Sequence, residues 1–270
     1  MLDDVLQDTI ALFGEQPDDD GRILYGELEL TTAPKEGKAN TLLADHLFSP
    51  SLLLAEQIER GLISLSNSSV VELGAGCALP SLLSTTLAQP PALVVITDYP
   101  DYTILNNLKD NISRNSRLKS PLCAVHCVGY EWGKDIGGIL ELLPRNSEPR
   151  GYDVVILSDL LHFDASHGVL ISSLTSLLRK TNSARTYVAA GKYTPKEVCK
   201  NFLKEAELAG ISWEEGEDDP TWRGKLEVKG GGLDIEQLGV RKGMCRWWIG
   251  RWDVNHPSNR FTDFRRDVDA

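Results

Sequence analysis

The 270-residue chain has little of what marks a membrane or secreted protein. It contains no apolar run near the roughly 18 residues that a membrane-spanning helix needs, so we expect no membrane contact. Its start, Met1-Leu2-Asp3-Asp4, is acidic and lacks the basic and apolar regions of a signal peptide. The five cysteines are an odd and scattered set, which indicates free thiols in a reducing compartment. We therefore expect a cytoplasmic protein.

Basic residues are also scarce, with 28 lysines and arginines against 39 aspartates and glutamates, for a net charge of −11. This balance opposes nucleic acid binding, which depends on neutralising phosphates, and it favours a basic peptide as partner. Metal ligands at zinc spacing are missing too. On a strand, Cys123 and Cys127 would share one face while His126 points to the other, so we expect no metal.

The most informative stretch that is present is SVVELGAGCALPSL, residues 69–82. Two β-branched residues lead toward Gly74 and Gly76, and an apolar, helix-like run follows the glycines. A buried strand that breaks at glycines and re-enters as a helix forms a cofactor cradle in α/β proteins. Glycine is needed there because a Cβ would hold the backbone away from the ligand.

Three residues, one apolar and two acidic, indicate which kind of ligand the glycine turn binds. A dinucleotide fingerprint needs a small residue where this chain has Leu79. Glu72 brings a carboxylate to the turn, which suits a cationic ligand such as S-adenosylmethionine better than a pyrophosphate. Asp98 closes the next apolar run, where an acid accepts hydrogen bonds from ribose hydroxyls. The alternative is a tight turn in an unrelated α/β protein, with Asp98 capping the next helix.

The rest of the chain alternates between strand and helix patterns. We expect further strands near residues 93–97, 123–128, 153–159, 184–193 and 244–252, and helices near 50–60, 80–88, 101–115, 166–179 and 195–209. This order predicts a mainly parallel sheet covered on both faces. We expect three parts along the chain. The first is a partly flexible N-terminal arm over residues 1–38, which begins with a short amphipathic helix. The main domain covers residues 39–254, and a polar tail covers residues 255–270.

With these motifs, the chain resembles class I, seven-β-strand, S-adenosylmethionine-dependent methyltransferases. Within that class it is similar to methyltransferase family 16, in the fungal branch once called nicotinamide N-methyltransferase-like. The pieces that carry the resemblance are VVELGAGCALPSL, TDYPD (97–101), YEWG (130–133) and VVILSDLLHF (154–163). A characterised member of that branch methylates the N-terminus and adjacent lysine of translation elongation factor 1A.

The resemblance implies a Rossmann-like α/β fold whose seven-stranded sheet has the order 3-2-1-4-5-7-6, with the seventh strand antiparallel. It also implies S-adenosyl-L-methionine as cofactor. Gly74, Ala75 and Gly76 would line its methionine end, Asp98 would hold its ribose and Trp132 would contact its adenine. The remaining cofactor contacts that we expect are Glu72, Tyr99 and Ser158.

The resemblance also makes Asp159 the first residue of the motif that follows the fourth strand, commonly Asp-x-x-Tyr or Asp-x-x-Phe. Here the fourth residue is His162, with Phe163 next, so the contact to the acceptor departs from the family pattern. We expect Asp159 to orient an amine and His162 to accept its proton. The acceptor would be a protein lysine or N-terminus, with elongation factor 1A as candidate partner of a monomeric enzyme. A nicotinamide-like small molecule is the alternative.

Two other classes of protein fit less well. A short-chain reductase needs a Tyr-x-x-x-Lys pair, but Gly191 stands four residues after Tyr187, and Tyr193 meets Lys196 at the wrong spacing. A non-catalytic module that merely binds the cofactor is disfavoured because the acidic and glycine residues of the cradle are all present.

Overall fold

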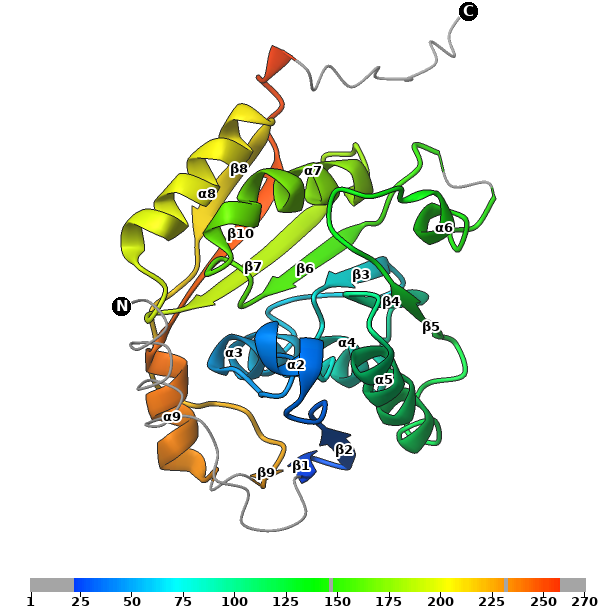
Figure 1. Ribbon diagram of the computed structural model, residues 1–270, viewed down its shortest axis with the longest axis vertical. Helices are drawn as coiled ribbons and strands as arrows, with labels where there is room; N and C mark the ends of the chain where they lie inside the picture. The colour runs from blue at the N-terminus through cyan, green and yellow to red at the C-terminus, as the bar shows by residue number, and fades with distance from the viewer. Residues whose placement is uncertain (1–21, 146–147, 231–232, 258–270) are drawn as a thin grey trace, which may run out of the picture.

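The computed structural model describes residues 22–145, 148–230 and 233–257 (Figure 1). The amphipathic helix predicted near the N-terminus and most of the predicted tail lie outside the described residues. Among the helices that are described, none has the length and apolar character needed to cross a membrane.

A seven-stranded sheet forms the centre of the fold, in the order β5-β4-β3-β6-β7-β10-β8. Its strands are β3 (Ser69–Leu73), β4 (Leu93–Asp98), β5 (Ala124–Gly129), β6 (Val154–Ser158), β7 (Arg185–Gly191), β8 (Ile211–Glu215) and β10 (Cys245–Trp252). Strands β3 to β7 run parallel, whereas β10 is antiparallel to both of its neighbours. Counted along the chain, this is the predicted order 3-2-1-4-5-7-6, which is therefore confirmed.

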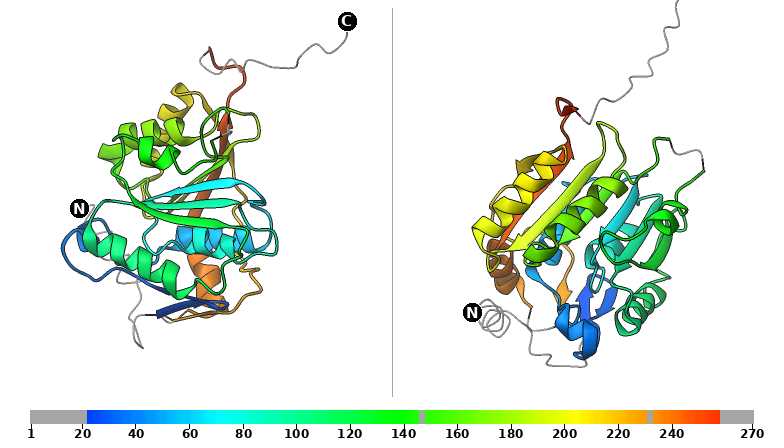
Figure 2. Two further views of the ribbon diagram at one scale, coloured as in Figure 1. Left: turned by 90° about the vertical axis from the view of Figure 1, so that its right-hand side faces the viewer. Right: turned by 45° about the horizontal axis from the view of Figure 1, so that its top comes forward.

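Helices cover both faces of this sheet (Figure 2). One face carries α3 (Ser49–Glu59), α4 (Leu79–Thr85) and α5 (Tyr102–Arg114). The other face carries α6 (Gly137–Leu140), α7 (His167–Leu177) and α8 (Lys196–Leu208). A 3₁₀ turn, η1 (Asp164–Ser166), precedes α7. Successive strand residues serve opposite faces, as with Val70 and Val71. Because both faces are covered, β3, β4 and β6 are buried at every position, which explains their near-continuous apolar sequences.

A second, three-stranded sheet joins the two ends of the described chain and was not predicted. Its strands are β1 (Arg22–Tyr25), β2 (Leu28–Thr31) and β9 (Val228–Lys229), and the short α2 (Gly37–Thr41) and α9 (Ile235–Gly243) lie in the same end regions of the chain. Its inward residues, including Tyr25 and Leu30, belong to the core cluster of the α3 face. The division at residue 38 between arm and main domain stays a prediction.

Asparagine side chains of α5 pair with the outer edge of β2. The Asn115 side chain accepts from the N–H of Glu29 and donates to the carbonyl of Glu29. One helical turn earlier, Asn111 makes the same two hydrogen bonds with Thr31, and all four distances are 2.8–3.0 Å. This pairing satisfies edge groups that would otherwise be open to another strand. Asn111 also donates to the carbonyl of Cys77, which links the small sheet to the glycine turn.

A buried ion pair connects α9 to α3. The Lys242 Nζ lies 2.7 Å from the Glu56 Oε2, and both side chains are almost fully shielded from solvent. The same ammonium donates to the carbonyl of Thr221, and the other Glu56 oxygen accepts from the backbone N–H of Arg223. The loop before β9 is therefore held against α3 by charged groups whose hydrogen bonds are satisfied inside the protein.

We expect Lys242→Met to lower the free energy of unfolding by about 3 kcal/mol, because the buried Glu56 carboxylate loses its close cation and keeps only the Arg60 guanidinium, 3.7 Å away. Urea titration followed by circular dichroism would measure the loss. Lys200→Met is the matched control, since Lys200 pairs with Glu197 at 2.8 Å on the exposed surface of α8 and should change stability by less than about 0.5 kcal/mol. Equal effects of the two substitutions would contradict a special role for the buried pair.

Candidate active site

A pocket opens at the carboxyl ends of β3, β4 and β6, where ligands bind in open α/β sheets. It contains about 1050 Å³ of space free of protein atoms, including its open mouth. Residues 42–48, which lead into α3, form a second side of the pocket. Every site residue predicted from the sequence lines this pocket except Glu72; those that do are Gly74, Ala75, Gly76, Asp98, Tyr99, Trp132, Ser158, Asp159 and His162.

The glycine turn after β3 forms the floor of the pocket. Gly74 and Gly76 have φ values of +60° and +57°, a left-handed conformation that glycine adopts without steric cost. A Cβ on Gly74 would lie 2.7 Å from the Leu160 Cδ2 and 3.2 Å from the Trp132 Cζ2. Glycine is therefore required at this position, because Leu160 and Trp132 pack directly against the backbone of the turn.

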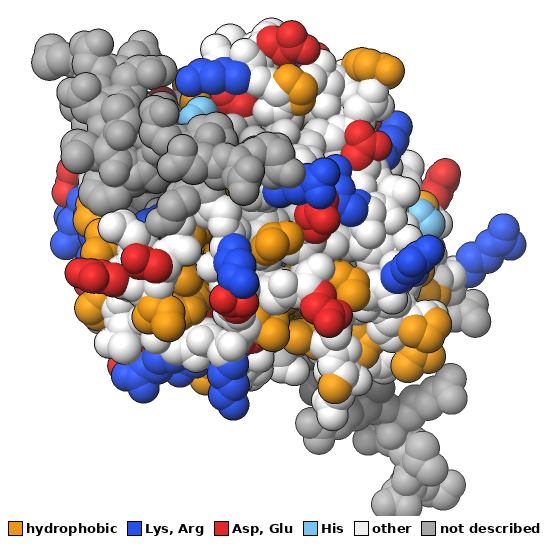
Figure 3. Space-filling model, turned by 90° about the horizontal axis from the view of Figure 1, so that it is seen from below, with side chains coloured by type: hydrophobic (Ala, Val, Ile, Leu, Met, Phe, Trp, Pro, Cys, Tyr) orange, Lys and Arg blue, Asp and Glu red, His pale blue; other side chains and the backbone are white. Residues whose placement is uncertain are grey.

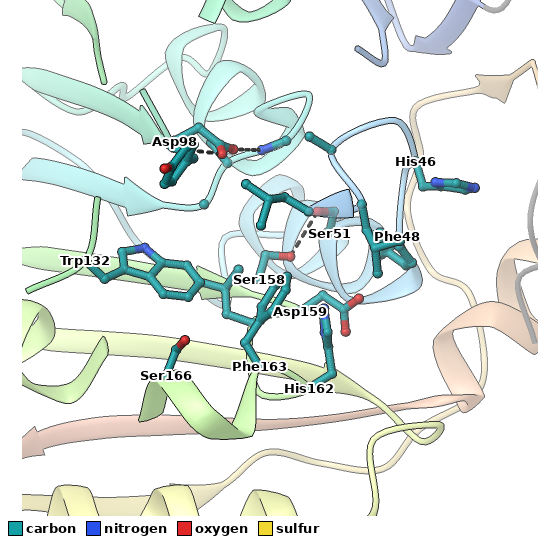
Figure 4. Close-up of a pocket in the computed structure, with 18 of the residues that line it drawn as sticks. His46, Phe48, Ser51, Asp98, Trp132, Ser158, Asp159, His162, Phe163 and Ser166 are labelled. Carbon is teal, nitrogen blue, oxygen red and sulfur yellow. Dashed lines mark hydrogen bonds between the residues drawn. The ribbon is translucent and has the colours of Figure 1, made fainter. Parts of the chain in front are cut away.

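Asp98 brings its carboxylate to the same turn (Figure 4). Its Oδ2 accepts from the Gly76 N–H at 2.8 Å, and its Oδ1 accepts from the Tyr99 N–H at 2.7 Å. Each oxygen keeps a lone pair for a further donor. Burial raises the pKa of Asp98 to about 6, so the carboxylate is mostly ionised at neutral pH.

Glu72 is fully buried in β3 and does not line the pocket. Burial raises the pKa of Glu72 to about 8. Ser81 lies close enough to lower this pKa, but neither carboxylate oxygen has a hydrogen bond of normal geometry. Glu72 is therefore mostly protonated and neutral at pH 7, and the negative charge near the turn belongs to Asp98.

Residues in and just before the start of α3 also line the pocket, and they were not among the predicted site residues. Phe48 and His46 line the pocket, and the hydroxyl of Ser51 lies 2.9 Å from the hydroxyl of Ser158 on β6. The guanidinium of Arg241, from α9, donates to the Leu47 carbonyl and to the Ser49 hydroxyl. No local motif marks this segment, because a residue about 190 positions away in the sequence holds it in place.

Asp159 and His162 lie together at the end of the pocket beside Phe48 (Figure 4). Burial raises the pKa of Asp159, although the neighbouring His162 opposes this shift. Burial lowers the pKa of His162, and neither of its ring nitrogens has a hydrogen-bond partner. Its ring packs on Phe163 with the centroids 4.0 Å apart. The imidazole is therefore neutral at pH 7 and has a nitrogen free to accept a proton.

Trp132 and Asp98 lie at the opposite end of the pocket in the same view (Figure 4). The indole meets the ring of Phe163 edge to face, with the centroids 5.8 Å apart, and it faces the glycine turn. The pocket thus has one end with an aromatic plane and a carboxylate beside bare backbone. Its other end has a carboxylate and an unprotonated histidine among aromatic rings.

Residues 35–209 match the sequence profile of a family described as lysine methyltransferase. The chain belongs to the lysine methyltransferase family. Two similar curated proteins are fungal enzymes named protein N-terminal and lysine N-methyltransferase EFM7. The one from Gibberella zeae is 28% identical over 212 residues, which are 76% of this chain and 79% of that protein. The one from Emericella nidulans is 28% identical over 160 residues, which are 58% of this chain and 61% of that protein.

The methyl donor of this lysine methyltransferase is S-adenosylmethionine, and the residues of the pocket fit it. The Asp98 carboxylate suits two vicinal ribose hydroxyls, and the Trp132 ring suits a flat purine. The ionised Asp98 carboxylate at the turn is compatible with a ligand that carries an ammonium and a sulfonium. A dinucleotide would place a pyrophosphate near the ionised Asp98 carboxylate, and Leu79, the fully buried first residue of α4, occupies its third glycine position.

No group of three or more histidines, cysteines, aspartates and glutamates within the described ranges could hold a metal ion. All five cysteines are free thiols. Cys123 is buried immediately before β5, and Cys127 is half-buried within it.

We expect Asp98→Ala to weaken S-adenosylmethionine binding more than tenfold, about 1.4 kcal/mol or above, because the ribose hydroxyls lose their acceptor. Affinity for the wild type should also fall as the pH drops through about 6, since protonation of Asp98 removes the charged acceptor. Isothermal titration calorimetry between pH 5 and 8 measures both effects. A folded Asp98→Ala protein with wild-type affinity would show that the ribose is held elsewhere.

Proposed function

We propose that this chain transfers a methyl group from S-adenosylmethionine to an amine of a protein, either a lysine or an N-terminus. The observation that carries this proposal is the pairing of Asp159 with the unpartnered His162 ring at the end of the pocket away from Asp98. An amine acceptor arrives positively charged and must lose a proton, and this pair offers a carboxylate and a neutral base. The names of the fungal relatives support the same acceptor class.

The cofactor supplies a methyl group already activated by a positively charged sulfur. The protein must therefore align the acceptor and keep its nitrogen unprotonated. A lysine, with a pKa of about 10.4, is mostly charged at neutral pH, so its lone pair is not available. In our proposal the Asp159 carboxylate accepts an N–H of the amine and orients it, and a His162 ring nitrogen takes the proton. Phe48 and Phe163 limit water at this end of the pocket.

We further propose translation elongation factor 1A as the protein substrate and a monomeric, cytoplasmic enzyme without a nucleic acid partner. The net charge of −11 favours a basic segment of substrate. On the face shown in Figure 3, lysine and arginine side chains are interspersed with acidic ones over the described surface, a pattern that does not favour a phosphate backbone. The free thiols suit a reducing compartment.

The test is methyl transfer by the purified full chain to purified elongation factor 1A, followed by intact-mass spectrometry and peptide mapping. We expect added methyl groups at the N-terminus or a neighbouring lysine. A substrate with an acetylated N-terminus separates transfer to the α-amine from transfer to lysine. Parallel reactions with free nicotinamide test the small-molecule alternative, and turnover of nicotinamide without labelling of any protein in a cell lysate would overturn the proposal.

The role of His162 has its own test. We expect His162→Phe to lower kcat for the protein acceptor by about 10² to 10⁴-fold, because the proton of the amine then has no acceptor. Affinity for S-adenosylmethionine should stay within about threefold, which calorimetry checks. The matched control is His126→Phe, because His126 lies exposed on the edge strand β5 and should leave kcat unchanged. Normal kcat in a His162→Phe enzyme would remove His162 from the mechanism.

A further inference from the structure

Tyr193 was not among the predicted site residues, and the predicted strand over residues 184–193 includes it. In the structure β7 ends at Gly191, and the chain then turns so that the Tyr193 hydroxyl donates to the Asp159 Oδ2. The Gly191 N–H donates to the other oxygen of Asp159, at 3.1 Å, and the Asp159 N–H donates to the Ala189 carbonyl at 2.8 Å. Three groups from the end of β7 thus hold one residue of the active site.

Asp159 has an unfavourable backbone conformation, which these contacts help to maintain. Its φ is +62°, in the left-handed region that residues other than glycine seldom adopt. Such a conformation is kept only where the surroundings impose it. Both carboxylate oxygens are occupied by donors from the β7 end, so the direction of the Asp159 side chain is determined by Gly191 and Tyr193 together.

The position of the Tyr193 ring depends in turn on a glycine and on the pocket wall. A Cβ on Gly191 would overlap the Tyr193 ring, so only glycine lets the ring fold back over the end of the strand. On its other side, the ring packs near Phe48, with the centroids 6.3 Å apart. Phe48 lines the pocket, whereas Tyr193 itself does not. Tyr193 therefore lies behind Asp159 as seen from the pocket.

We propose that Tyr193 is a positioning residue for methyl transfer, whose hydroxyl fixes the Asp159 carboxylate in the direction of the acceptor amine. This inference rests on the proposed function. The phenol stays protonated and acts as a donor, because burial and the neighbouring Asp159 raise its pKa well above the usual value. The ring contacts neither the cofactor nor the acceptor in this account, so its effect on the reaction passes through Asp159.

The hydrogen bond also bears on the charge of Asp159. The ionisable groups around this carboxyl are His162 on its own loop, Tyr193 and Cys199 after β7, and Cys245 at the start of β10, while Arg241 from α9 acts on Tyr193. Burial raises the pKa of Asp159, and the donated O–H opposes that rise. Loss of the hydroxyl should therefore raise the pH at which Asp159 ionises.

The experiment compares Tyr193→Phe with the wild type in the methyl transfer assay across pH. We expect kcat at pH 7 to fall about tenfold, and the acidic limb of the profile to move up by about one pH unit, the usual effect of losing a hydrogen bond to a charged group. Affinity for S-adenosylmethionine should not change. Tyr187→Phe is the matched control, since Tyr187 lies on β7, the strand that precedes Tyr193, and its hydroxyl makes no hydrogen bond to a described residue.

A double-mutant cycle with Asp159→Asn decides whether Tyr193 acts through Asp159. We expect Tyr193→Phe to have little further effect on kcat or on the pH profile when Asp159 is already asparagine. Effects that multiply in the double variant, or an acidic limb that does not move in the single one, would overturn the inference. If the wild-type enzyme itself transfers no methyl group to a protein amine, the proposed function has failed instead.

Discussion

The candidate active site of this lysine methyltransferase depends on the close packing of backbone against Leu160 and Trp132 at the end of β3. Two glycines in left-handed conformations bring the chain under Trp132, and the carboxylate of Asp98 is tied to the N–H of Gly76 at 2.8 Å. The glycine conformations and the hydrogen bond to Asp98 are both needed to shape this end of the pocket. A Cβ on Gly74 would collide with Leu160 and crowd the indole, and without the Gly76 N–H the Asp98 carboxylate would keep only the Tyr99 N–H as a backbone donor.

The pocket contains two carboxylates with different surroundings and, in our proposal, different tasks. Asp98 has two backbone donors and a pKa of about 6, so it can remain an acceptor for neutral hydroxyls. Asp159 has one backbone donor, one phenol and a neighbouring imidazole, which suits it to a cationic amine. The environment of each carboxyl, rather than the residue type, separates cofactor binding from acceptor binding.

Elements near both ends of the described chain contact the candidate active site or the helix beside it. The β1–β2 hairpin is fastened to α5 through asparagine side chains, and Asn111 reaches the carbonyl of Cys77 in the glycine turn. From the other end, Arg241 on α9 holds the segment that carries Phe48, while Lys242 joins the same helix to α3. The pocket is therefore supported by elements outside the parallel part of the sheet.

Local patterns in the sequence predicted the strands of the main sheet and the glycine cradle, whereas the strand order came from the family resemblance. Apolar strands and the Gly74–Gly76 turn involve neighbours in the chain, so their spacing predicts them directly. Asp98 and Asp159 were also predictable, because a residue that ends a parallel strand must lie at the ligand-binding edge. The β1–β2 hairpin gave a weak signal, since its strands have only four residues each and its stability comes from distant partners. Only the tertiary structure decided that Phe48 lines the pocket and that Tyr193 turns back to Asp159. Those positions follow from contacts between residues far apart in the chain, such as Tyr193 with Asp159 and Arg241 with Leu47, and no local spacing records them.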